Sequence, residues 1–373
     1  MKRILKILLL MPILFAMLLP LSVKVNAFEE NIDSYNEEFD FQRIADAIDS
    51  ETAEILNEMG IDEISFEKLF SVNISKVFKV LFDITKRSLT EPMQFLVSAT
   101  GVLILTALFS TFLNSSQLFS VIGNSVLALS VAVPVVNAVT TAFSVLETLN
   151  MFTTAFAGVF AMLVSASGKV ALGTSYASLA VLSDTLFSTL LTGVSQPAVN
   201  AMCSLGFLSC LDLYKFSEKI SSTVKKIYIT FLGFIGTFFS GIVTLKGVMG
   251  AGVDSLTSRG IRFVVGRTVP IVGGAVSDTY SALVSSLSLI KSTVGIFGIV
   301  TVVLTVFPSL LELIGWVFSL SIVVSISELL GSSSCVGMFN IFKDALTLLG
   351  ATTVFSAVIF IVSVGVVIFV RGV

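Results

Sequence analysis

The sequence contains no histidine, three cysteines and one tryptophan in 373 residues. The lack of histidine removes the usual general base and the commonest metal ligand. Cys203, Cys210 and Cys335 form no CxxC pair, and they suit the role of small packing residues better than a redox or metal site. We therefore predict no metal and no cofactor.

Charged residues are also scarce. They make up 13% of the chain, against roughly 25% of an ordinary soluble domain, while 55% of the residues are hydrophobic. This composition predicts an all-α, multi-pass membrane protein. The charges are uneven: residues 28–92 hold sixteen acids and six bases, whereas residues 93–373 hold nine acids and twelve bases.

The motifs of common enzyme classes are missing, since there is no Walker-type phosphate loop, no GxSxG and no HExxH. Asp184 and Asp278 match an intramembrane aspartyl protease only in number, because their flanking residues lack that family's motifs. No basic surface interleaved with aromatic residues suggests nucleic-acid binding. We predict neither enzymatic activity nor a nucleic-acid partner.

Residues 1–27 have the pattern of a secretory signal peptide. Lys2, Arg3 and Lys6 precede a long apolar run, and small residues occupy the cleavage positions at 25–27. The alternative is an uncleaved first span. In both cases the segment that follows lies outside the cytoplasm.

Residues 28–92 are predicted to form short acidic, amphipathic helices. Apolar residues recur at helical spacing from Ile44 to Met59, Gly60 ends that helix, and Ser65 caps a second one. Their apolar faces would lie on the membrane or on a partner. The alternative is a solvated acidic face with no partner.

Residues 93–373 are predicted to form a bundle of about seven to nine transmembrane helices, beginning at Pro92 in a first helical turn. The expected spans are 93–113, 119–143, 149–167, 174–192, 195–213, 227–246, 294–314, 315–331 and 347–370. Four lysines mark the loop 214–226 as cytoplasmic. Abundant small residues predict close packing of helices in lipid and a helix face available to neighbours, including another copy.

Three acids, Asp184, Glu312 and Glu328, fall within or at the edges of these spans and are candidates for intramembrane sites. For Glu312 and Glu328, a position at the end of a span is favoured over a proton relay.

Charge reappears in the segment 249–295, which we call the 249–295 element. Asp254, Arg259 and Arg262 share a polar helical stripe, and Gly266, Pro270, Gly273 and Gly274 break regular helix. Irregular backbone at membrane depth must be buried in protein or line a wet cavity.

This pattern favours a re-entrant or cavity-lining element, with Arg267 and Asp278 lining or bracing a polar path. The alternative is a juxtamembrane loop with solvated charges. If one span follows the cytoplasmic loop 214–226, the arginines of the 249–295 element lie outside the cytoplasm. This position is contrary to the positive-inside rule.

The run GRTVPIVGGAVSDTYSALVSSLSLIKSTVGIFGI, followed by Phe307-Pro308, resembles the signature of the stage III sporulation protein AE family. The segment LVSASG at 163–168 also resembles that family, and the arginine-rich stretch 259–267 departs from it. The signature positions are Pro270, Val272, Gly273, Asp278, Thr279, Lys291, Thr293, Val294 and Gly295. Gly274 adjoins them at the expected helix break.

This resemblance implies a non-enzymatic subunit of a channel complex that joins the mother cell to the forespore during endospore formation. Its location would be the mother-cell membrane around the forespore. Implied partners are a secretion-type ATPase, small membrane proteins and ring-forming intermembrane proteins. The complex would support late forespore gene expression and the passage of small molecules.

Two other functions stay open. A stand-alone secondary transporter would require inverted repeats and paired broken helices, for which the breaks at 193–197 and 266–274 are a weak pair. A membrane scaffold would contain no conduit.

Overall fold

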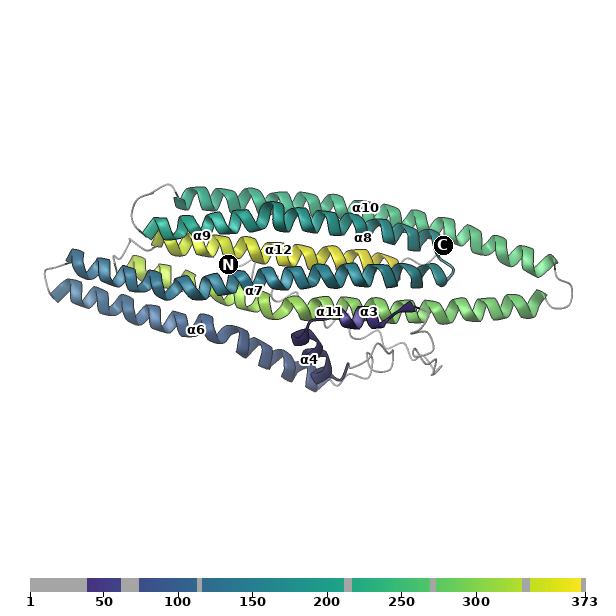
Figure 1. Ribbon diagram of the computed structural model, residues 1–373, viewed down its shortest axis with the longest axis horizontal. Helices are drawn as coiled ribbons and strands as arrows, with labels where there is room; N and C mark the ends of the chain where they lie inside the picture. The colour runs from purple at the N-terminus through teal and green to yellow at the C-terminus, as the bar shows by residue number, and fades with distance from the viewer. Residues whose placement is uncertain are drawn as a thin grey trace.

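The computed structural model describes residues 39–61, 74–112, 116–210, 217–268, 273–330 and 336–369, without the side chains of 109–121, 123, 124, 210 and 258–283. In this part of the chain all regular structure is helical (Figure 1). The expected signal peptide at 1–27 lies outside the described residues.

Two short helices precede the bundle, α3 (Gln42–Asp46) and α4 (Ser50–Met59). The Asp49 carboxylate accepts a hydrogen bond from the Thr52 N–H at 2.9 Å and caps α4 at its start. Gly60, with φ of +87°, ends it in the left-handed conformation. Local sequence thus fixes both ends of α4.

The apolar face of these two helices packs on the bundle of the same chain. Ile44, Ile55, Leu56 and Met59 are buried and belong to one hydrophobic core with residues of the long helices. In Figure 1, α3 lies against α7, and α4 lies against α11 and α6. The apolar face predicted from sequence is therefore covered by the membrane domain itself.

The bundle consists of long helices that run back and forth along one axis (Figure 1). They are α6 (Ile74–Phe112), α7 (Ser116–Ala166), α8 (Val170–Leu190), α9 (Gln196–Cys210), α10 (Ser217–Thr268), α11 (Gly273–Leu329) and α12 (Val336–Phe369). A π-helical turn, Leu191–Ser195, joins α8 to α9 into one rod.

In the described residues, six helices are long and apolar enough to cross a membrane, which corrects the seven to nine predicted. The expected spans 119–143 and 149–167 are one helix of 51 residues. The two spans within 294–331 are also one helix, which contains Pro308. The chain contains uninterrupted helices where apolar stretches of bilayer length suggested separate spans.

Gly193 and Pro197 do not separate two spans. Gly193 lies within the π-helical turn, and Pro197 follows that turn as the second residue of α9. Pro92 was expected to open the membrane domain, but α6 begins eighteen residues earlier, at Ile74. The charged N-terminal half of α6 and its apolar C-terminal half therefore form one continuous helix.

Helix α11 is the centre of the bundle. In its most apolar window 83% of the residues are buried, against 22% in the corresponding windows of α6 and α10. Towards its C-terminal end, the Trp316 ring lies 5.4 Å from that of Phe95 on α6, and the Ser319 hydroxyl donates to the Pro92 carbonyl at 2.8 Å. The outer helices leave their apolar faces to lipid.

Candidate functional site

The 249–295 element forms the end of α10 and the start of α11. The backbone is helical to Thr268 and again from Gly273, so Gly266, Gly273 and Gly274 lie within helices and do not break them as predicted. Residues 269–272 lie outside the described residues. Figure 1 shows both helices extending past the ends of α8 and α12. Pro270 and the side chains of Arg267 and Asp278 lie outside the described residues, as do contacts of Gly273 and Gly274.

The base of this element is described, and there Asp254 joins α10 to α8. Its side chain is buried, and its two carboxylate oxygens accept hydrogen bonds from the N–H groups of Ala171 and Leu172, both at 2.8 Å. These groups belong to the first turn of α8 and have no partner inside the helix. A negative charge also interacts favourably with the positive end of the helix dipole.

Lys291 is the second charged group at the base, and it is almost completely buried, with 1% of its surface exposed. Its ammonium group donates to the Val367 carbonyl in the last turn of α12 at 3.5 Å. Lys169, in the turn between α7 and α8, lies beside it. The ammonium groups of Lys169, from the α7–α8 turn, and of Lys291, from α11, thus lie near the end of α12.

Gly295 lies one turn further along α11. A Cβ atom on this residue would come within 2.5 Å of Cδ1 of Ile368 on α12 and 3.2 Å of the Phe160 ring on α7. The missing side chain therefore permits α11 to approach both neighbours closely. Of the predicted signature residues, the structure brings Lys291 and Gly295 together at the junction of α11 with α12.

A second set of polar groups, absent from the sequence predictions, runs along α10 and α12. We call it the α10–α12 polar strip. Asp344, whose side chain is 6% exposed, pairs with Lys225 and accepts a hydrogen bond from the Ser221 hydroxyl at 3.5 Å. At the exposed end of the strip, the Asn340 amide donates a hydrogen bond to the Glu218 carboxylate at 2.7 Å.

Deeper in the bundle, the strip continues as three buried hydroxyl groups. The Tyr228 hydroxyl lies 2.9 Å from that of Thr352 and also hydrogen-bonds to Ser195, which lies 3.3 Å from Thr352. Ser195 is the last residue of the π-helical turn, a feature often found at functional sites. The strip therefore joins α10, α12 and the α8–α9 rod by polar contacts in an apolar core.

The three acid candidates lie apart from both clusters. Asp184 is half-buried and accepts a long hydrogen bond from the Thr154 hydroxyl at 3.3 Å. Glu312 is half-buried within α11, and Glu328 is exposed at the second-last residue of that helix. The described residues contain no group of three His, Cys, Asp or Glu side chains that could hold a metal ion.

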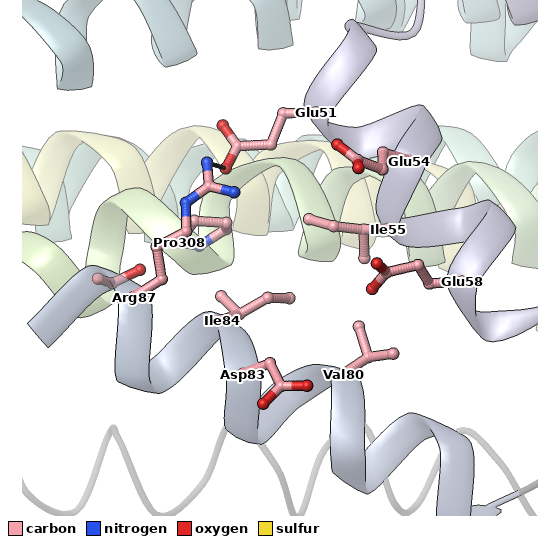
Figure 2. A pocket seen from close by; sticks show the side chains of 10 residues that line it. Glu51, Glu54, Ile55, Glu58, Val80, Asp83, Ile84, Arg87 and Pro308 are labelled. Carbon is pink, nitrogen blue, oxygen red and sulfur yellow. Dashed lines mark hydrogen bonds and ion pairs between the residues drawn. The ribbon is translucent and has the colours of Figure 1, made fainter.

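An acidic recess of about 140 Å³ lies between α4, α6 and Pro308 of α11. Figure 2 shows Glu51, Glu54 and Glu58 of α4 and Asp83 of α6 around it, with Arg87 joined to Glu51 by an ion pair of 2.7 Å. Both partners of this pair are substantially exposed, so that it contributes little to stability.

The six spanning helices and the charged groups buried between them define a polytopic α-helical membrane protein. The sequence matches the model of the stage III sporulation protein AE family over residues 52–370. The protein belongs to this family and therefore has a role in sporulation.

A curated relative supports this assignment. Over 210 residues the chain is 23% identical to the stage III sporulation protein AE of Bacillus subtilis (strain 168). The alignment covers 56% of this chain and 52% of the relative, so the chain matches about half of the relative's length. No solved structure matches the protein.

Proposed function

We propose that the protein is a non-enzymatic membrane subunit of the channel complex that links mother cell and forespore. In this proposal it lies in the mother-cell membrane around the forespore and serves the passage of small molecules that late forespore development requires. The family match across residues 52–370 carries the proposal, because it covers α4 and the whole bundle rather than one short motif.

The structure adds two features that suit such a subunit. The α10–α12 polar strip supplies buried polar groups to a largely apolar bundle, and such groups commonly mark solute or ion pathways. The hairpin of α10 and α11 extends past its neighbours and offers a surface for assembly (Figure 1). The proposed partners are an ATPase, small membrane proteins, ring-forming intermembrane proteins and a further copy of this chain.

The central test is genetic complementation in the spore-forming host. Deletion of the gene should reduce heat-resistant spores by several orders of magnitude and silence a late forespore reporter, while engulfment is completed normally. The intact gene should restore both. Normal spore yield after deletion would contradict the proposal.

Two further measurements separate the alternatives. Purified protein in liposomes should not move solutes by itself, and rapid unaided transport would favour a stand-alone transporter. Cysteines introduced between 267 and 290 in a cysteine-free chain should react with an aqueous maleimide at some positions in sporulating cells. Uniform protection would favour a scaffold without a conduit.

A further inference from the structure

The rod formed by α8, the π-helical turn and α9 is long and apolar enough to cross a membrane, yet its outer face carries polar side chains. We call this surface the α8–α9 outer face. The hydroxyl and amide groups exposed on it include those of Thr174, Ser178, Thr185, Thr192, Asn200 and Ser204.

The π-helical turn keeps these polar groups in line. Thr185 and Thr192 are seven residues apart, close to two turns of α-helix, whereas Asn200 follows Thr192 only after eight residues. The π-helical turn at Leu191–Ser195 takes up about one extra residue, so Asn200 stays in line with the two threonines. In a regular α-helix Asn200 would be rotated by roughly 100° from this position.

Ionisable side chains from three helices border the α8–α9 outer face. Half-buried Lys246 of α10 donates a hydrogen bond to the Ser178 hydroxyl at 2.6 Å. Half-buried Asp184 of α8 accepts one from the Thr154 hydroxyl of α7 at 3.3 Å. Glu147 is exposed and lies seven residues before Thr154, hence on the same side of α7. All three ionisable residues belong to segments that can cross a membrane.

These groups extend along the full thickness of a bilayer. From Ser178 to Asn200 the rod rises about 33 Å, against about 30 Å for the hydrocarbon core. The core therefore includes several outward polar groups wherever it lies on the rod. The hydroxyls of Thr185 and Thr192 bond to carbonyls of their own helix and tolerate lipid, but carboxylate, ammonium and exposed amide groups are costly there.

We propose that the α8–α9 outer face lines a water-filled path for small cationic or zwitterionic solutes. Ionisable side chains in membrane segments almost always face the protein interior or a wet cavity rather than lipid. Two of the three groups that border the face are acids, and acidic linings favour cations over anions. This inference rests on the proposed function, in which neighbouring subunits of the channel complex close the open side of the path.

The test measures how fast single cysteines react with water-soluble methanethiosulfonate reagents in membranes broken open from sporulating cells. Each cysteine is placed in the full chain with its three native cysteines replaced by serine. The variants are Thr185→Cys, Thr192→Cys and Asn200→Cys. Labelling after denaturation confirms that every cysteine is present.

The controls are Phe234→Cys and Phe238→Cys on the apolar outer face of α10, where these side chains are 70% and 65% exposed. Lys246 contacts Ser178, and Tyr228 contacts Ser195, so α10 runs antiparallel to the rod. This arrangement places Phe238 and Phe234 at about the depth of Thr185 and Thr192. A difference in reactivity then reports the surroundings of each face and not its depth.

We expect the three cysteines of the α8–α9 outer face to react at least tenfold faster than the two controls. At position 192 a cationic reagent should react faster than an anionic one of similar size. Replacing both acids, by Glu147→Gln and Asp184→Asn, should remove most of this preference.

Two results would overturn the proposal. Protection of the α8–α9 outer face equal to that of the controls would place it against lipid or protein. Equal rates with the two reagents would contradict a path for cations. Spore counts from the same strains separate this inference from the proposed function, because normal spore yield with a protected face would contradict only the water-filled path.

Discussion

Gly295 sets the spacing between three helices because it has no side chain. Replacing it with leucine would force Ile368 and Phe160 to move, since the first added carbon already comes within 2.5 Å of Ile368. We expect Gly295→Leu to lower the free energy of unfolding by about 1–3 kcal/mol, the usual cost of overpacking a core.

Gly365 on α12 is the matched control for this substitution, because a Cβ atom there meets nothing within 4 Å. Gly365→Leu should change stability by no more than about 0.5 kcal/mol. Thermal unfolding of both variants in the same detergent makes the comparison. Equal losses of stability would show that the close approach at Gly295 has no energetic role.

Asp254 offers a second test at the level of a single residue. Asp254→Ala removes the acceptor for two N–H groups at the start of α8, and we expect a loss of about 1–2 kcal/mol. Hydrogen exchange at Ala171 and Leu172 should accelerate, while exchange in the middle of α8 should not.

Ser255→Ala is the control for Asp254→Ala, because the Ser255 hydroxyl bonds within its own helix, to the Gly252 carbonyl. It should leave exchange at Ala171 and Leu172 unchanged. Unaltered protection of these amides in Asp254→Ala would rule out the capping role.

Helices α10 and α12 are joined by the pair of Lys225 and Asp344 in a setting where an unpaired charge is costly. We expect Asp344→Leu to destabilise the bundle by about 2–4 kcal/mol, because Lys225 then keeps its charge without its partner. The double variant Lys225→Met/Asp344→Leu should recover much of that loss.

The control is Lys226→Met, since Lys226 is exposed on the adjacent position of α10. It should have little effect, either alone or with Asp344→Leu. Additive losses in the Lys225 and Asp344 double-mutant cycle would mean that the two side chains do not interact in the folded protein.

The sequence predicted which segments form helices better than it predicted where each helix begins and ends. The hydrophobic stretches located all six membrane helices, because a long, nearly uncharged apolar run is stable mainly inside a bilayer. Among the described residues their number is six rather than seven to nine, because apolar runs of bilayer length do not reveal whether the helix continues between them. Glu147 and Pro308 lie within unbroken helices, and Gly193 within a π-helical turn.

For the candidate sites, the sequence motif included Lys291 and Gly295, which the structure places at the junction of α11 with α12, but the sequence contained no sign of the α10–α12 polar strip. Lys225 lies among four lysines that indicate a loop, yet α10 already begins at Ser217. Asp344 lies 119 positions away from it. A single sequence carries no signal for that pairing, because it depends on how two distant helices pack.

At the scale of the whole molecule, the acidic N-terminal helices are part of the membrane domain rather than a separate unit. The Thr52 hydroxyl of α4 donates to that of Thr305 on α11 at 3.1 Å, and both residues are buried. In a chain without its native cysteines, Thr52→Cys/Thr305→Cys should form a disulfide on mild oxidation, detectable by mass spectrometry of the linked peptides.

Asn57→Cys/Thr305→Cys should not cross-link, because Asn57 lies on the exposed face of α4. Cross-linking of both pairs at similar rates would indicate that α4 has no fixed position against α11. Failure of the first pair to react would place α4 away from the bundle.

The hairpin of α10 and α11 also has a mechanical consequence. From Lys291 to Gly273 the chain is one continuous helix of roughly 27 Å at 1.5 Å per residue. If this helix rotates as a rigid body about Lys291, a rotation of about 10° displaces its far end by about 5 Å. In the proposed complex, a small rotation near Lys291 would therefore produce a larger movement at the end of the hairpin, where a neighbouring subunit would bind.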